Sequence, residues 1–162
     1  MEKVLLLKRA STNALGMSSD EIWLRNPAEQ NQEEIEIYRE IFEFVMEDLE
    51  SISEPKDIIT EGAAFLPELV HRIGIDVNTY LCIVPTKEFQ YHHYKQRPWV
   101  PYILKDCTDK EQAFENWMER DAMFAVYAKQ SADQLGYQTI LTDGKRDINA
   151  VVQQVCDLFM LG

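Results

Sequence analysis

The chain has 162 residues, of which 46 % are hydrophobic, so it is long enough to bury one proper core and is most simply one domain over residues 1–162. Its formal net charge of −12 argues against a general binder of nucleic acids or membrane surfaces, because polyanions would be repelled over most of its surface. The three cysteines, Cys82, Cys107 and Cys156, are widely spaced and form no CxxC pair. We therefore expect reduced thiols rather than disulfides or a zinc site.

The N-terminal stretch contains only one short apolar run, Val4–Leu7, which suits a buried strand. Four residues are too few for a signal peptide or a membrane span, so we expect a soluble, cytoplasmic protein. The residues that follow are loop-like. Ser18, Ser19, Asp20 and Glu21 then provide caps for a short helical turn.

A long helix is predicted from Pro27 to about Ser51, because apolar residues return at steps of three and four. The rest of this segment is strongly acidic, and Arg39 is the only cation opposing nine carboxylates. Such a pattern normally indicates a solvated face. The alternative is a surface that meets a partner.

The β-branched run Ile58-Ile59-Thr60 predicts a central strand that ends at Glu61 and Gly62 and passes into a helix starting near Phe65. In open α/β sheets, ligands bind beyond the carboxyl ends of the strands. Glu61 is therefore a candidate catalytic or metal-orienting group. The alternative is a carboxylate that only favours the first turn of the following helix.

A second buried strand is predicted at Thr79–Pro85, and the alternation of strands and helices favours a parallel sheet covered by helices. The next segment, about residues 86–108, concentrates cations and aromatic rings on an otherwise acidic chain. It suits a lid over a polyanionic small molecule, with a helix to about Gln96 and an irregular stretch at Pro98 and Pro101. The alternative is a surface helix with snorkelling side chains. Its candidate ligand groups are His92, Lys95 and Arg97, and we predict no metal site, because the adjacent His92 and His93 diverge and lack a third ligand.

The longest helix is predicted from Lys110 to about Leu135, opened by the capping-box pattern Thr108-Asp109-Lys110-Glu111. Asp121 falls on its apolar stripe and therefore needs a partner. Arg120 lies at the edge of that stripe, where it would either bind phosphate in a ligand cleft or form a structural ion pair. A last strand, Thr139–Thr142, and a final helix capped by Asp147 complete the chain.

These motifs together resemble the P-loop nucleotide and small-molecule kinases, in particular cytidylate- and shikimate-kinase-like proteins. The resemblance covers about residues 18–161 and rests on Ile59-Thr60-Glu61-Gly62, the strand end at Val84-Pro85, the basic segment, Glu119-Arg120-Asp121 and Thr142-Asp143-Gly144. It implies a three-layer α/β fold that binds ATP, Mg²⁺ and a nucleotide or other phosphate ligand. Glu61 and Arg120 would then be catalytic, with Lys95, Arg97 and His92 holding substrate or phosphate and Asp143, Gly144 and Lys145 contacting the nucleotide.

The chain departs from that family at its N-terminus, where no GxxxxGK followed by Ser or Thr is found. The family's first strand, loop and first helix have no counterpart, and these parts hold the β- and γ-phosphates and Mg²⁺. We therefore expect impaired ATP binding in a protein of kinase-like ancestry. The alternative function is a non-catalytic, dimeric interaction module, because a missing central strand leaves exposed sheet edges.

Overall fold

The computed structural model describes residues 16–53 and 58–161. The predicted strand at Val4–Leu7 lies outside the described residues. The helices in these ranges are α3 (Ser19–Trp23), α4 (Pro27–Glu50), α5 (Pro67–Arg72), α6 (Lys87–Lys95), α7 (Val100–Ile103), α8 (Lys110–Gln134) and α9 (Ile148–Phe159). The strands are β1 (Leu81–Pro85) and β2 (Gln138–Thr142).

The predicted three-layer parallel sheet of a P-loop fold is wrong. Helices account for 60 % of the structure, and the described residues hold a single sheet of two short strands. β1 and β2 are parallel, in a register that pairs Leu81 with Gln138 and Pro85 with Thr142. The expected parallel direction is therefore correct, but the broad central sheet is not formed.

The run Ile58-Ile59-Thr60, predicted to be the central strand, is not a strand. Ile58 is 48 % exposed and Ile59 is 78 % exposed, so neither side chain is buried as a central strand requires. β-branched residues favour extended backbone, but a strand also needs a neighbour for its main-chain hydrogen bonds. No described residue supplies that neighbour.

The long helices follow the predicted patterns closely. α4 begins where the Asn26 side chain accepts a hydrogen bond from the N–H of Ala28 at 2.8 Å, with Pro27 in the first turn. α8 has Asp109 as its N-cap, and the Asp109 carboxylate accepts a hydrogen bond from the N–H of Gln112 at 3.0 Å. The predicted cap at Thr108 is therefore one residue too early, and Thr108 instead donates to Asp20, at the start of α3, at 2.7 Å.

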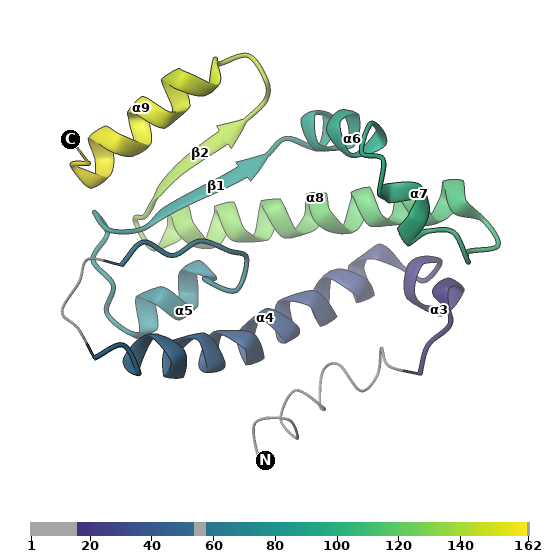
Figure 1. Cartoon of the computed structure of the whole chain (residues 1–162), viewed down its shortest axis with the longest axis horizontal. Coiled ribbons are helices and arrows are strands. Elements are labelled where there is room, and N and C mark those ends of the chain that lie inside the picture. The colour runs from purple at the N-terminus through teal and green to yellow at the C-terminus, as the bar shows by residue number, and fades with distance from the viewer. Residues whose placement is uncertain (1–15, 54–57, 162) are drawn as a thin grey trace.

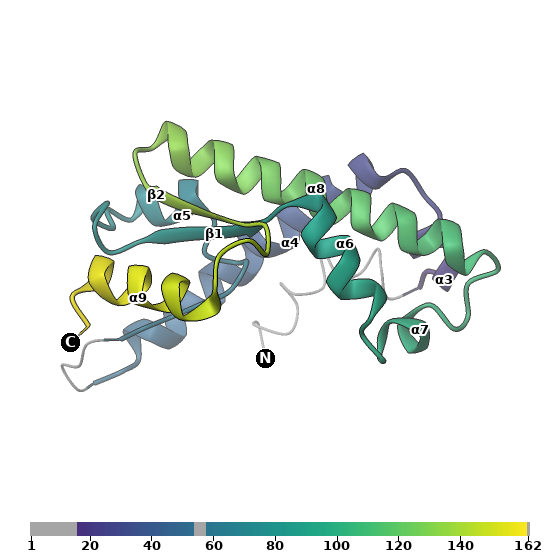
Figure 2. The same cartoon turned by 90° about the horizontal axis from the view of Figure 1, so that it is seen from above.

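α8 lies along one face of the small sheet and α9 lies on the opposite face (Figure 2). α4 runs beside α8, with α5 near the C-terminal end of α4 (Figure 1). The main core lies between these helices and β1. Its buried residues are Ile35, Phe42, Leu66, Leu69, Val70, Cys82, Val84, Ala125, Ala128, Ala132 and Tyr137.

A second core joins α3, α7 and the first half of α8. Its buried residues are Val100, Leu104, Cys107, Ala113, Trp117 and Met118. Trp23 stacks at a tilt on Trp117 with ring centroids 4.8 Å apart, and Trp99 lies 5.8 Å from the same ring. The stretch around Pro98 and Pro101, predicted to be irregular, thus contains the short helix α7 and packs against α8.

Candidate functional site

The predicted site residues do not come together in one place. Glu61 is exposed and follows the extended run at Ile58, so it stands at the end of no strand. His92, Lys95 and Arg97 are exposed on the last turn of α6 and just beyond it. Arg120 lies near the middle of α8, and its side chain is only 16 % exposed.

Several cations of the basic segment have contacts with nearby side chains. His92 Nε2 lies 2.8 Å from the Gln96 side-chain nitrogen, and the Lys95 Nζ lies 5.5 Å from the centre of the Tyr91 ring. Lys87 forms an ion pair with Glu119 of α8. The predicted lid is therefore a helical segment tied to α8, and its role over a ligand stays a prediction.

The loop after β2 holds the three residues predicted to contact a nucleotide. The Asp143 carboxylate accepts from the N–H of Lys145 at 3.0 Å and pairs with the Lys145 Nζ at 3.1 Å. These interactions lower the pKa of Asp143. Gly144 has φ +79°, and a Cβ there would lie 3.0 Å from the Phe89 ring of α6. The loop is therefore closed on itself and against α6.

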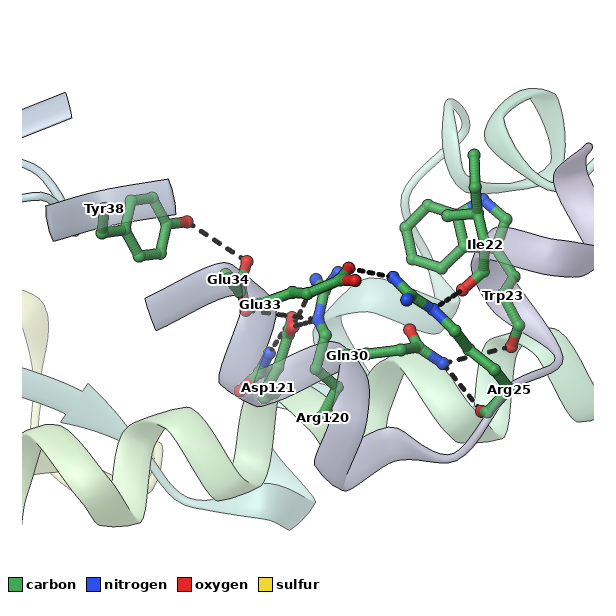
Figure 3. Close-up of polar contacts among 10 residues, drawn as sticks. Ile22, Trp23, Arg25, Gln30, Glu33, Glu34, Tyr38, Arg120 and Asp121 are labelled. Carbon is green, nitrogen blue, oxygen red and sulfur yellow. Dashed lines mark hydrogen bonds and ion pairs between the residues drawn. The ribbon is translucent and has the colours of Figure 1, made fainter. Parts of the chain in front are cut away.

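Arg120 is the centre of a partly buried polar cluster, which we call the α4–α8 clamp: Glu34, Gln90, Arg120 and Asp121. Figure 3 labels Glu34, Arg120 and Asp121 of this cluster. Its Nη2 and Nε donate to Asp121 Oδ1 at 2.6 Å and 2.8 Å, and its Nε lies 3.3 Å from Glu34 Oε2. Gln90 of α6 donates to the other oxygen of Asp121 at 2.7 Å. The clamp therefore joins three helices.

The surroundings of the clamp are apolar and aromatic. The Arg120 guanidinium lies 5.4 Å from the Trp23 ring centre and 6.0 Å from that of Trp117, within the range of cation–π attraction. The Tyr38 hydroxyl donates to Glu34 at 3.2 Å, and burial beside that carboxylate raises the pKa of Tyr38 to about 12. The need of Asp121 for a partner is thus confirmed. Because carboxylates and rings surround the guanidinium, the geometry favours the structural ion pair over phosphate binding.

The clamp holds two carboxylates against one guanidinium, and burial raises the pKa of both Glu34 and Asp121. A carboxyl group with a raised pKa binds its proton more tightly in the folded state. Its contribution to the free energy of unfolding therefore rises as the pH falls through the raised pKa, and levels off below the ordinary value.

We expect the wild type to gain stability relative to Glu34→Gln as the pH falls from 7 towards 4.5, the ordinary value for a glutamate. Urea unfolding of both proteins over this range measures the difference. Asp143→Asn is the matched control, for which we expect a change in stability of the opposite sign. Because the pKa of Asp143 is lowered, the wild type should lose stability relative to Asp143→Asn as the pH falls through 3.8 and below. A wild type that loses stability relative to Glu34→Gln over the first range would contradict the assignment.

A second polar network, which the sequence patterns did not reveal, joins α4, α5 and α8. Arg39 lies 3.3 Å from the Glu68 carboxylate and donates to the Tyr127 hydroxyl at 3.0 Å. Tyr127 also donates to Glu68, and Ser131 does so at 3.2 Å. Sequence spacing gave no signal for it, because its members come from three separate helices. It fixes these helices around the main core.

Within residues 16–53 and 58–161, β1 pairs with a neighbouring strand on one side only, which leaves a free edge. The Thr86 N–H donates to the carbonyl of Thr142 at 2.9 Å, so the main-chain N–H of Thr86 points towards β2. Main-chain groups of alternate residues in a strand point to the same side, so those of Val84 and Cys82 also face β2. The N–H and C=O groups of Leu81 and Ile83, and the carbonyl of Pro85, face the other way. No described residue bonds to them. We call these groups, with the Ile83 side chain, the open edge.

The surroundings of the open edge are apolar. Ile83 is 50 % exposed, although its neighbours Cys82 and Val84 are buried against α8. The extended run that begins at Ile58 lies on the side of β1 away from β2 and follows its direction in both views (Figures 1 and 2). The open edge therefore combines unpaired main-chain groups with exposed isoleucines on two segments.

A shallow, mostly apolar groove of about 570 Å³ lies between α8 and the carboxyl ends of the strands. Its floor includes Met123, Val126 and Leu141, which are 37–54 % exposed, and the Lys87–Glu119 ion pair borders it. The groove contains none of the residues predicted to be functional. Its lining gives no chemistry that selects one ligand.

Residues 16–53 and 58–161 contain no group of three or more His, Cys, Asp and Glu side chains that could hold a metal ion. None of the described helices is both long and apolar enough to cross a membrane.

Comparisons with protein-family models, with curated proteins and with solved structures found no match to this chain.

Proposed function

We propose that this chain is a non-catalytic interaction module that takes up an extended segment of another polypeptide at the open edge. The observation that carries the proposal is the two-stranded parallel sheet, in which the main-chain groups on one side of β1 bond to no described residue. Parallel sheets normally have covered faces, and a pair of short strands is only marginally stable by itself. An added strand satisfies the free donors and acceptors and covers Ile83.

The placement of the predicted catalytic groups also supports a non-catalytic role. Glu61, the exposed cations at the end of α6 and the loop after β2 lie on separate segments. The Arg120 guanidinium is held by carboxylates of the α4–α8 clamp. General acid–base and phosphoryl-transfer chemistry requires groups that converge on one reacting atom. Phosphotransfer and the binding of ATP and Mg²⁺ stay predictions that no contact among the described residues favours.

Strand addition is a recurrent way of binding peptides, in which main-chain hydrogen bonds give affinity and alternate side chains give specificity. A neutral, end-capped peptide of sequence TVIVIVT is a suitable probe, because its residues favour extended backbone. We expect saturable binding by calorimetry. We expect Ile83→Lys to weaken it about tenfold or more, since a lysine on an edge strand opposes the approach of a further strand.

Ile148→Lys is the matched control for that variant. Ile148 is 69 % exposed on α9, so the substitution adds the same charge at another exposed isoleucine and should leave binding unchanged. Circular dichroism should show that both variants are folded. Equal binding by both variants, or no binding by the unmodified chain, would contradict the proposed function.

A further inference from the structure

β2 has an outer side that faces away from β1. The Thr142 carbonyl accepts a hydrogen bond from the chain of the other strand, so the main-chain groups of Thr142 and of every second residue before it face β1. The N–H and C=O groups of Thr139 and Leu141 therefore face outward, and no residue in the described part of the chain bonds to them. Unlike the far side of β1, which the run from Ile58 follows, this side has no described segment beside it (Figures 1 and 2). We call these outward groups, with the Leu141 side chain, the β2 edge.

The β2 edge lacks the features by which proteins keep sheet edges from pairing. Such features include charged side chains, prolines and bulges on the outermost strand. The sequence of β2 is Gln-Thr-Ile-Leu-Thr, which contains no charge and no proline, and its five residues pair with β1 in continuous register. β2 is therefore regular, uncharged and free on one side, as a strand that accepts a further strand must be.

The apolar groove beside α8 continues the β2 edge on one face of the sheet. Leu141 lines this groove together with Met123 and Val126 of α8. Leu141 is exposed, although Val84, its partner in the register of the two strands, is buried. α8 thus covers β1 more completely than β2. A chain that pairs with β2 would cover Leu141 and lie over the groove.

The charges near the β2 edge are balanced. Lys129 pairs with Asp133 before β2, and Lys145 pairs with Asp143 after it. Residues 136–162 contain three carboxylates and two cations, whereas α4 contains nine carboxylates and one cation and lies on the side of the molecule away from β2 and α9 (Figure 1). The net charge of −12 therefore does not keep a second copy of the chain away from this edge.

A second copy of the β2 edge matches the first. A two-fold axis perpendicular to the sheet at Ile140 makes the two β2 strands antiparallel and places Thr139 opposite Leu141 of the second copy. The free N–H and C=O groups of these residues then bond in two reciprocal pairs. The groups of Ile140 at the axis already face β1.

A second copy also brings its own helices. Two strand pairs side by side place equivalent helices about two strand spacings, roughly 10 Å, apart, which is close to the usual distance between packed helices. A lone peptide would satisfy the main chain of β2 but would bring no helix to cover the faces of the enlarged sheet. The second copy is therefore the better occupant.

We propose that the β2 edge is the self-association surface of this protein. Two copies pair β2 with β2 in antiparallel register about Ile140 and form a four-stranded sheet, with Leu141 and the α8 groove of each copy in the interface. This inference goes beyond the proposed function, because the dimer leaves the open edge of β1 unused.

Sedimentation of the full chain over a wide range of concentrations tests the inference. We expect a species of twice the mass of one chain, and we expect Leu141→Lys to raise its dissociation constant about tenfold or more, because a lysine on an edge strand opposes pairing. Val126→Lys, which places a charge in the groove, should act in the same direction.

Ile59→Lys is the matched control, because it adds the same charge at an exposed isoleucine beyond β1 and should leave the dimer intact. Ile83→Lys, the variant expected to weaken peptide binding, should also leave the dimer intact. Failure of this inference is thereby distinguishable from failure of the proposed function. Circular dichroism should show that all four variants are folded.

Disulfide cross-linking tests the register. Antiparallel pairing about Ile140 places Gln138 opposite Thr142 of the second copy, within the Cα separation that a disulfide spans. In a Cys156→Ser background, which leaves only the buried Cys82 and Cys107, a mixture of Gln138→Cys and Thr142→Cys chains should cross-link on mild oxidation. Either variant alone should not.

A monomer at every concentration, or a dimer that Leu141→Lys leaves unchanged, would overturn the inference. Cross-links formed within a single variant would overturn the antiparallel register. Slow hydrogen exchange at the Thr139 and Leu141 amides of a monomer would also overturn it, and would mean that the chain's own residues cover the edge.

Discussion

Replacing Arg120 by Met is expected to lower the free energy of unfolding by about 3 kcal/mol, because breaking a largely buried ion pair leaves two carboxylates poorly compensated. The side chains of Glu34 and Asp121 are only 20 % and 14 % exposed, so water cannot replace the guanidinium fully. The contacts with Trp23 and Trp117 would be lost at the same time. Equilibrium unfolding in urea measures the change.

Two further variants separate the charge effect from lost packing. Adding Glu34→Gln to Arg120→Met should recover part of the stability, because it removes one of the unpaired carboxylates. Lys145→Met is the control for loss of an exposed cation, since its ion pair with Asp143 is at the surface, where such pairs contribute little. A loss below about 1 kcal/mol for Arg120→Met would show that the α4–α8 clamp does not hold the helices together.

Replacing Phe42 by Ala is expected to cost about 3–5 kcal/mol, since it removes a large side chain from a packed interior and leaves a cavity. Phe42 is 2 % exposed and lies on the α4 face that meets the main core. Its ring contacts Phe65 edge-on, with centroids 6.2 Å apart. Thermal and urea unfolding both report the loss.

Ile59→Ala is the matched control for Phe42→Ala, because Ile59 is 78 % exposed and its truncation should change stability by less than about 0.5 kcal/mol. A large effect at Ile59 would show that the run from Ile58 is packed in solution. A small effect at Phe42 would contradict the placement of the main core between α4, α5 and α8.

Local features of the sequence predicted the helices well. α4 and α8 start within one residue of their predicted first residues, because apolar spacing and capping groups act within one or two turns. The partner that Asp121 needs was predictable for the same reason, since a carboxylate on an apolar stripe must be compensated. The sequence could not identify Glu34 as part of the α4–α8 clamp, because that requires knowing that α4 lies beside α8.

The sheet was predicted less well, because strands depend on residues far away along the chain. Ile58-Ile59-Thr60 has the composition of a strand, but composition cannot supply the neighbouring strand that its main chain needs. β1 and β2 form because the main chain of each strand supplies hydrogen-bond partners to the other. The expectation that an absent central strand exposes sheet edges assumed the wider sheet of a P-loop fold, and that sheet is not there.

The candidate site shows the same division. Glu61, Arg120 and the α6 cations were selected by residue type, and the structure places them apart. Nothing in the sequence distinguishes Ile83 from the other apolar residues of the predicted buried strand. Its importance comes from the side of β1 that it faces, which depends on the register with β2.

The open edge is tested most directly by amide hydrogen exchange at single residues of β1, measured by NMR with and without the peptide TVIVIVT. The amides of Cys82 and Val84, which face β2, should exchange slowly in both samples. Those of Leu81 and Ile83 should exchange fast in the free chain and slowly with peptide. Slow exchange at Leu81 and Ile83 in the free monomer, or no slowing on addition of peptide, would contradict strand addition at this edge.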